Sequence, residues 1–370
     1  MERRFGERTR PYSGAVTLPV RPPLAPMLAK AARDIPPEGA GMLYEPKWDG
    51  FRCVVFRDGA DLDLQSRNHK PLLRYFPELR EPLLAQLPDR VVLDGELVVA
   101  GERGLDFDLL QQRQHPAASR VARLAAEIPA SFVAFDVLAL GDDALLDVAL
   151  SERRARLEAL LARARPPLYC TPATTDPDVA RDWFDRFEGA GFDGVVAKPL
   201  AGLYEPGRRV VTKIKHERTC DCAVGGYRMH KDGLGVGSLL LGLHDAAGVL
   251  HHVGVASGMA AGVRAELLDA VQPLRTGAAA GHPWSGWDAP EAHRGGRMPG
   301  GVNRWSAGRD LSWEPVRVEA VVEVAYEGLT NGRFRHNARF RRWRPDRDPA
   351  SCGYAQLEVV APAELRALFG

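Results

Sequence analysis

The sequence predicts an α+β protein of two domains, a mixed domain to about residue 217 and a smaller β-rich domain after it. Three observations support this prediction. The chain has 370 residues, enough for two domains. Residues 20–217 alternate β-like runs with segments of helical spacing, whereas residues 218–370 carry mostly short β-like runs. Residues 1–19 are polar and rich in arginine, so we expect a mobile arm there.

Apolar runs and alternation predict the strands of the first domain, and apolar residues at helical spacing predict its helices. Ser151 is predicted as a helix N-cap, and Pro177 as the first residue of a later helix that ends near Gly189 or Gly191. The other helical pattern covers residues 72–87. The predicted strands are 53–56, 61–66, 91–99, 131–140, 194–198 and 210–215.

The second domain carries β-like runs at residues 238–243 and 318–324 and one helical pattern at 261–271. Residues 276–312 are crowded with glycine, proline and tryptophan. We interpret this stretch as a long loop or insertion within a small barrel.

The composition is that of an ordinary soluble globular protein, with 45% hydrophobic residues and a formal net charge of +1. Any basic surface must therefore be local. The five cysteines include no Cys-x-x-Cys pair, which argues against a zinc ribbon. Neither a secretory leader nor a membrane span is predicted. We expect a soluble cytoplasmic protein.

The tetrapeptide Lys47-Trp48-Asp49-Gly50 lies between the β-like pattern that begins at Leu43 and the predicted strand 53–56. Taken alone, a Lys-x-Asp-Gly sequence is more often a surface turn with a solvated lysine. Its flanking residues favour a buried position over a surface turn, because 43–46 and 51–55 are largely apolar. A lysine that leads into a turn between two buried strands is well placed to be partly desolvated in a cleft.

Charged residues interrupt three of the other predicted strands. They are Asp94-Gly95-Glu96, Asp193 to Lys198, and Lys213 with Lys215, which alternation places on one face of a strand. Ionised groups in apolar strands are costly unless they are paired, hydrogen-bonded or metal-bound. Together with Lys47, these motifs give four charged positions in order, each where a strand meets a turn. We expect them to form one common site.

This ordered set of motifs resembles the covalent nucleotidyltransferase superfamily of ATP-dependent DNA ligases, RNA ligases and mRNA capping enzymes. The resemblance runs from Leu18 onward and includes Ser66-Arg67-Asn68, Phe135-Asp136 and residues 339–347. The segments 24–29 and 334–349 resemble the small two-domain bacterial ligases called ligase C, relatives of the end-joining ligase D. The implied fold is an adenylation domain of antiparallel sheets with flanking helices, followed by a β-barrel OB-fold domain.

The resemblance implies that Lys47 attacks the α-phosphate of ATP, passes AMP to the 5′-phosphate of a nick, and that the 3′-hydroxyl then seals the strand. Phosphoryl transfer is mainly positioning and charge stabilisation. Lys213 and Lys215 are implied to hold the α-phosphate, and Glu96 and Asp193 to bind Mg²⁺. Besides Glu96, six further residues are implied to contact ATP or the nick: Glu45, Arg52, Arg67, Phe135 (stacked on adenine), Lys198 and Arg344.

Seven arginines lie between Arg333 and Arg347, against one acidic residue, Asp346. Phe334, Phe340 and Trp343 interleave with them, as expected of a strand with one buried side. By resemblance, Arg344 and Asp346 orient the pyrophosphate when the second domain closes over ATP. Residues 216–219 would be the hinge that lets DNA enter.

Two positions depart from the family pattern, since Asp193 stands where many members have Glu and Arg347 where Lys is usual. The implied partner is nicked double-stranded DNA, bound by a monomer in the bacterial cytoplasm at the nucleoid, with DNA-repair proteins as further partners. Two alternatives remain. One is an RNA ligase or capping enzyme of the same superfamily, and the other a non-catalytic nucleic-acid-binding OB-fold protein.

Overall fold

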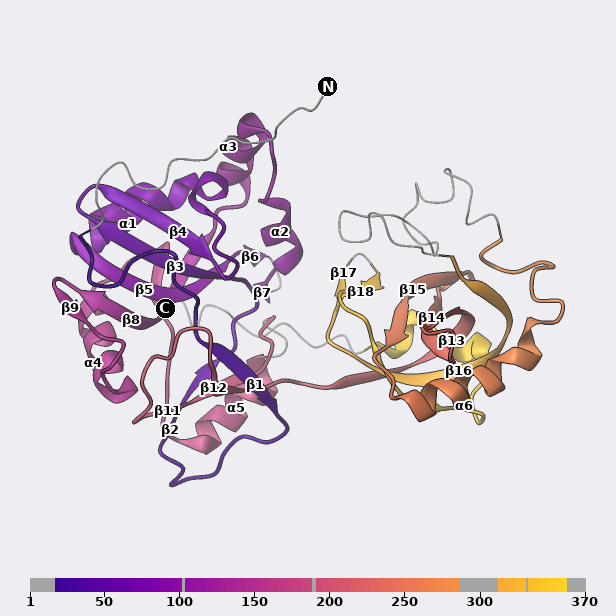
Figure 1. Cartoon of the computed structure of the whole chain (residues 1–370). Helices are drawn as coiled ribbons and strands as arrows, with labels where there is room; N and C mark the ends of the chain where they lie inside the picture. The colour runs from indigo at the N-terminus through magenta and orange to yellow at the C-terminus, as the bar shows by residue number, and fades with distance from the viewer. Residues whose placement is uncertain (1–16, 102–103, 188–190, 286–311, 331, 358–370) are drawn as a thin grey trace. The chain divides into compact units, whose positions relative to one another are not determined.

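The computed structural model describes residues 17–101, 104–187, 191–285, 312–330 and 332–357. Over these residues the chain forms two units, which divide between His216 and Glu217 (Figure 1). Leu18 is fully buried, so the folded part of the first unit begins before residue 20. Residues 1–16 of the predicted arm lie outside the described residues.

The first unit contains two larger sheets over the described residues. In the six-stranded sheet β9 (Asp143–Ala144) pairs with β8, and the other strands follow the order β10 (Leu168–Cys170), β8 (Ser131–Leu140), β5 (Arg90–Val98), β3 (Phe51–Asp58), β4 (Asp61–Ser66). The four-stranded sheet has the order β1 (Leu28–Ala32), β12 (Arg209–Ile214), β11 (Val195–Pro199), β2 (Met42–Pro46). Pairing is antiparallel as expected, except that β10–β8 and β1–β12 are parallel.

Alternation of side chains along β3 gives the six-stranded sheet two buried faces. Cys53 and Val55 point into one core, which helices cover. Val54 and Phe56 point into a second core, which includes Val211 of the four-stranded sheet. The six-stranded sheet therefore lies between helices on one face and the smaller sheet on the other (Figure 1).

The helices of the first unit lie between its strands in the chain. They are α1 (Arg80–Gln86), α2 (Phe107–Gln112), α3 (Ala118–Glu127), α4 (Leu150–Leu161) and α5 (Pro177–Phe187), and a short hairpin, β6 (Ala100–Gly101) with β7 (Gly104–Leu105), precedes α2. Pro177 opens α5 as predicted. The prediction of Ser151 as an N-cap is wrong, because α4 begins at Leu150 and its N-cap is Ala149. Of 72–87 only α1 is α-helical, and two 3-10 turns that flank Phe76 precede it.

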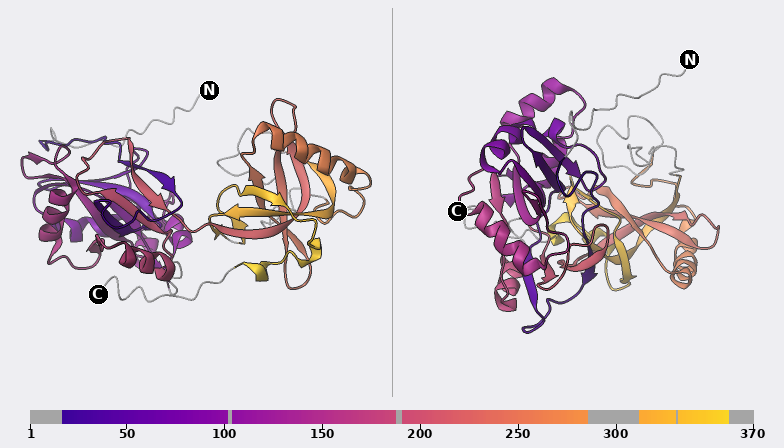
Figure 2. Two further views of the ribbon diagram at one scale, coloured as in Figure 1. Left: turned by 90° about the horizontal axis from the view of Figure 1, so that it is seen from below. Right: turned by 60° about the vertical axis from the view of Figure 1, so that its left-hand side comes forward.

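In the part that the structure describes, the second unit is a five-stranded antiparallel sheet with one α-helix, α6 (Ala261–Val271), at the predicted position. The strand order is β15 (Leu250–Ser257), β14 (Val236–His244), β13 (Arg218–Met229), β16 (Glu314–Tyr326), β19 (Arg339–Trp343), and a small hairpin joins β17 (Leu329–Thr330) to β18 (Arg333–Phe334). A bridge between Ala256 and Ala338 connects the two edges of the sheet. This closure produces the small barrel expected of an OB-fold (Figure 2).

Much of the long stretch predicted as a loop, residues 286–311, lies outside the described residues. Before it, Trp284 is fully buried in the barrel core. In the part of the chain that the structure describes, no helix is long and apolar enough to cross a membrane.

Candidate active site

Lys47 lies in the turn between β2 and β3, and two main-chain hydrogen bonds fix its backbone. The Lys47 amide donates to the carbonyl of Gly194 (2.8 Å), and the Asp193 amide donates to the carbonyl of Lys47 (2.9 Å). These bonds hold the lysine turn against the residues that lead into β11. The two motifs that the sequence separates by almost 150 residues are thus direct neighbours.

The glycines of both motifs are required by close packing. A Cβ on Gly50 would lie 2.2 Å from the carbonyl oxygen of Leu97, well inside contact distance. Gly194 has φ +126°, and a Cβ there would lie 2.0 Å from the carbonyl oxygen of Ile214. Any larger residue would push the Lys47 turn away from its neighbours.

Lys47, Asp193 and Lys215 form a compact ion cluster. Oδ2 of Asp193 lies 2.9 Å from Nζ of Lys47 and 2.9 Å from Nζ of Lys215, and all three side chains are about one-fifth exposed. Lys215 directly follows β12, which pairs with β11 in the four-stranded sheet. Two cations that share one accessible carboxylate are suited to exchange that carboxylate for a phosphate.

Asp94 and Glu96 lie on the same face of β5, two residues apart. Asp94 is fully buried and accepts two hydrogen bonds from the guanidinium of Arg52, both at 2.6 Å. Burial raises the pKa of Glu96 to about 7, although the charges of Arg52 and Lys47 oppose the shift. Glu96 is therefore a desolvated carboxyl group within the electrostatic reach of Lys47.

Phe135, on β8, lies beneath two cations. The guanidinium of Arg52 is 4.3 Å and the ammonium of Lys198 is 4.5 Å from the centre of its ring. Cations over an aromatic face are attracted by its quadrupole. The ring predicted to stack on adenine is buried, and these two cations contact it.

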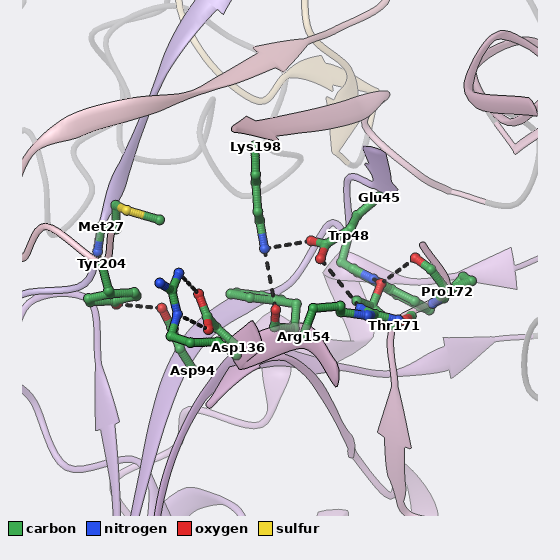
Figure 3. A network of polar contacts seen from close by, with 12 residues as sticks. Met27, Glu45, Trp48, Asp94, Asp136, Arg154, Thr171, Pro172, Lys198 and Tyr204 are labelled. Atoms are coloured by element: carbon green, nitrogen blue, oxygen red, sulfur yellow. Dashed lines mark hydrogen bonds and ion pairs between the residues drawn. The ribbon is translucent and has the colours of Figure 1, made fainter. Parts of the chain in front are cut away.

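Glu45 is buried between two cations, Lys198 and Arg154 (Figure 3). Its carboxylate lies 2.6 Å from Nζ of Lys198 and 3.5 Å from a guanidinium nitrogen of Arg154. Arg154 also donates to the carbonyl of Thr171, whose hydroxyl accepts a hydrogen bond from the indole of Trp48 (2.8 Å). The residues on both sides of Lys47 are therefore anchored by polar contacts.

The two predicted magnesium ligands, Glu96 and Asp193, are not equally suited to bind the ion. The described residues contain no group of three or more acidic, histidine or cysteine side chains that could hold a metal. Magnesium at phosphoryl-transfer sites takes only one or two carboxylates together with substrate phosphates. Glu96 fits such a site, because a cation would stabilise its desolvated carboxylate. Asp193 is already shared by two lysines.

Lys213, Arg67 and Arg344, the other predicted residues, come from three different positions in the chain. Lys213 lies within β12, two residues before Lys215. Arg67 is exposed in the turn after β4, and no contact among the described residues joins it to the cluster. Arg344 belongs to the second unit, where its guanidinium lies 2.8 Å from Asp346 and 3.0 Å from Asp221.

Sequence reasoning missed three buried polar residues around this site: Arg153, Arg154 and Tyr204. The two arginines were detectable, because the spacing of Leu150, Leu157 and Leu161 places them on the buried face of α4. Tyr204 lies in an irregular segment between β11 and β12, and its spacing carries no such signal.

An amine held at a rigid turn, beside a second lysine and a desolvated carboxyl group, is suited to covalent attack on a phosphate. The fold and this site define a covalent nucleotidyltransferase. Family models match most of the chain. The ATP dependent DNA ligase domain covers residues 26–215, and the ATP dependent DNA ligase C terminal region covers residues 232–347.

Individual proteins agree with the family models. DNA ligase C2 of Mycolicibacterium smegmatis is 54% identical and covers 92% of this chain and 96% of that protein. DNA ligase C of Mycobacterium tuberculosis is 53% identical and covers 92% and 95%. A solved structure from a structure–function study of Lig E DNA ligases shares the fold with TM-score 0.50 and 19% identity, over 86% of this chain and 99% of that chain.

The chain belongs to the ATP-dependent DNA ligase family. The predicted resemblance is thereby confirmed, as are the predicted fold and the ATP-dependent sealing of DNA nicks that is the reaction of this family.

Proposed function

We propose that Lys47 is the residue that carries AMP when this chain seals 5′-phosphate/3′-hydroxyl nicks in duplex DNA. The observation that supports this role most directly is the ion cluster, in which Nζ of Lys47 lies 2.9 Å from Asp193 at a turn fixed from both sides. Lys215 contacts the same carboxylate. It would remain paired with Asp193 when the side chain of Lys47 turns to the nucleotide.

In the first step the neutral amine of Lys47 attacks the α-phosphorus of ATP and pyrophosphate leaves. Lys213 and Lys215 hold the α-phosphate, and Lys198 and Glu45 contact the nucleotide from the side of β11 and β2. Phe135 stacks on adenine. To reach the ring, the base must displace Arg52 and Lys198 or share the ring face with them. Arg344 of the second unit orients the pyrophosphate.

In the second and third steps the phosphoramidate bond on Lys47 breaks as the 5′-phosphate of the nick takes the AMP. The 3′-hydroxyl then attacks that phosphate, AMP leaves, and a phosphodiester bond forms. Arg52 and Arg67 contact the ribose and the 5′-phosphate. A bound magnesium ion would supply charge neutralisation at the phosphates. Glu96 is suited to hold it, with Asp193 as the second expected ligand.

The expected hinge covers residues 216–219; because β13 begins at Arg218, we propose that the peptide joining His216 to Glu217 is its central part. The ring of His216 stacks on Phe184 of α5 with centroids 3.6 Å apart, and its Nε2 lies 2.6 Å from the Phe184 carbonyl oxygen. Glu217 accepts hydrogen bonds from Arg339 and Arg341 within the second unit. Each residue is held by its own unit, so a rotation between the units falls on the few bonds between them.

Further proposals concern the setting of the reaction. We propose magnesium as the metal, a monomer as the working form, and action on nucleoid DNA together with repair proteins. The likeness of segments 24–29 and 334–349 to ligase C and ligase D supports a role in repair. Light scattering of the purified chain, alone and with a nicked duplex, tests the monomer.

The adenylation of Lys47 is tested by mass spectrometry of the intact chain and its peptides after incubation with ATP and magnesium. One AMP should be found on the peptide that contains Lys47, and none in Lys47→Arg, which keeps the charge but offers no free amine. Lys30→Arg is the matched control, because Lys30 is an exposed lysine on β1. Labelling of the Lys47→Arg variant, or labelling from GTP or NAD in place of ATP, would refute the proposal.

A nick-sealing assay across DNA and RNA strand combinations then tests the acceptor. Sealing of a nick with DNA on all strands is expected to be fastest. A clear preference for RNA at the nick would replace DNA as the proposed acceptor.

A further inference from the structure

Tyr204 is a buried tyrosine whose hydroxyl links two parts of the first unit. It lies between β11 and β12 and is only 3% exposed. Its hydroxyl donates to Oδ2 of Asp94 (2.6 Å) and accepts a hydrogen bond from the backbone amide of Met27 (3.1 Å). Figure 3 shows Tyr204 and Met27 beside Asp94. The hydroxyl uses both its donor and an acceptor site in a place without solvent.

Asp94 depends on this hydroxyl because it is itself out of contact with water. It is 0% exposed, and in the described part of the chain its carboxylate accepts hydrogen bonds from the Tyr204 hydroxyl and from the guanidinium of Arg52. A buried carboxylate that loses one of its hydrogen bonds becomes less stable and shifts to recover contact. Removal of the Tyr204 hydroxyl should therefore move Asp94.

Arg52 in turn depends on Asp94 for its orientation. Two hydrogen bonds of 2.6 Å fix the plane of the guanidinium, which lies 4.3 Å from the Phe135 ring centre. A third, longer contact of 3.5 Å joins the guanidinium to the carbonyl of Met27, the residue whose amide donates to Tyr204. A planar fork of this kind transmits a displacement of its carboxylate directly.

The segment that carries Tyr204 is itself held rigidly. The amide of Tyr204 donates to the carbonyl of Leu146 (2.9 Å). The nearby carbonyl of Gly202 accepts from the amide of Leu150 (2.9 Å) and from the guanidinium of Arg153 (3.2 Å). The backbone of Tyr204 is thus held in place by residues at and before the start of α4. Its phenol can therefore keep Asp94 in a fixed position.

We propose that Tyr204 is a positioning residue that sets the orientation of Arg52 toward the nucleotide and the nick by holding Asp94. The inference rests on the proposed contact of Arg52 with substrate. It adds to that function a residue that itself touches neither ATP nor DNA.

The test is a double-mutant cycle of Tyr204→Phe with Arg52→Gln, with single-turnover rates of self-adenylation and of nick sealing as readouts. Tyr204→Phe removes one oxygen, and the loss of a hydrogen bond to a charged group should slow the more affected step about tenfold. KM for ATP should change less than about twofold if the ground state is little affected. In the Arg52→Gln background Tyr204→Phe should have no further effect, because its target is gone.

Tyr44→Phe is the matched control. Tyr44 is equally buried, at 1% exposed, and its hydroxyl donates to the carbonyl of Pro36 (2.7 Å) and takes no part in the Asp94 network. If the Tyr44 and Tyr204 variants lose rate equally, or if the effects of Tyr204→Phe and Arg52→Gln add, the positioning role is wrong. If Tyr204→Phe does not fold, Asp94→Asn takes its place in the same cycle with the same expected absence of additivity.

The outcome also separates this inference from the proposed function. Unchanged rates for Arg52→Gln would remove the substrate contact of Arg52 and the role of Tyr204 with it. Slow Arg52→Gln with a normal Tyr204→Phe would remove the role of Tyr204 alone.

Discussion

The carboxylate of Asp193 lies 2.9 Å from the ammonium group of Lys47, and the same oxygen lies at the same distance from Lys215. Burial alone would raise the pKa of Asp193, but the charges of the two lysines outweigh burial and hold this pKa below its usual value. The carboxylate therefore stays ionised at neutral pH and keeps two like charges together. In its absence Lys47 and Lys215 would repel each other.

From this contact we predict that Asp193→Asn slows self-adenylation at least about tenfold, because the loss of a charge-assisted contact displaces the Lys47 side chain. Asp193→Glu, which restores the residue usual in the family, should retain most of the rate. Quenched-flow measurement of AMP transfer to the protein gives both values. Equal rates for Asp193→Asn and the unmodified chain would show that the ion cluster has no part in catalysis.

The second prediction concerns Asp136, which follows Phe135 on β8. Its carboxylate accepts two hydrogen bonds from Arg153 of α4 (2.8 and 2.9 Å), and both side chains are 1% exposed. Breaking a buried pair by changing one partner typically costs about 3–5 kcal/mol. Asp136→Asn should therefore lower the unfolding free energy by that order and leave residual adenylation in the folded fraction.

Urea unfolding of the full chain measures the Asp136 effect. Arg156→Ala is the control, because Arg156 pairs with Glu152 one helical turn away in a partly exposed position, where such a pair is worth less than about 1 kcal/mol. A similar loss in both variants would mean that burial of the Asp136 pair contributes nothing special to stability.

These contacts show how far the sequence alone could lead. Lys47, Glu96 and Asp193 each interrupt an apolar strand or turn, and such interruptions are visible in the chain because strands have a period of two. Strand periodicity predicted β3, β4, β5, β8, β11 and β12 of the first unit, and helical spacing predicted α6. Sequence reasoning could not show that Lys47 and Lys215 share one carboxylate, because that contact depends on the pairing of β11 with β2 and β12.

Other parts were beyond sequence reasoning for a physical reason. Tyr204 acts through a hydroxyl in an irregular segment, where neither helical nor strand periodicity applies. Phe135 was predicted to face adenine, yet whether a ring meets a base or a cation depends on long side chains from distant elements, here Arg52 and Lys198. Their rotamers follow from tertiary packing and not from local pattern.

A third prediction follows from the contacts of Arg344. Its guanidinium is held by Asp346 (2.8 Å) and Asp221 (3.0 Å), so the charge has a fixed direction before any ligand binds. Because pyrophosphate leaves only in the first step, Arg344→Ala should slow self-adenylation more than it slows sealing of a pre-adenylated nick. Single-turnover assays of the two steps measure the difference.

Arg342→Ala is the control for Arg344. Arg342 is exposed on β19 and pairs with Glu323. It should affect DNA binding and its salt dependence before it affects either chemical step. A larger loss in the sealing step for Arg344→Ala would contradict the assignment to pyrophosphate.

The last prediction concerns the acid stability of the second unit and rests on His252. Burial, together with the charges of Arg333 and Arg228, holds the pKa of His252 well below 6.5. Its Nδ1 accepts a hydrogen bond from Arg333 (2.6 Å), and its ring packs edge-on against Trp284. In the unfolded chain the same histidine gains a proton as the pH falls through about 6.5. The unfolded state then binds more protons, so stability is present above that pH and is lost below it, by up to about 1.4 kcal/mol per pH unit for this group.

His252→Asn keeps an acceptor for Arg333 but cannot titrate, and it should flatten the fall in unfolding free energy between pH 6.5 and 5. His336→Asn, at an exposed position, should leave the slope unchanged. Urea unfolding monitored by tryptophan fluorescence across this range measures both slopes, and a slope for His252→Asn as steep as that of the unmodified chain would refute the assignment.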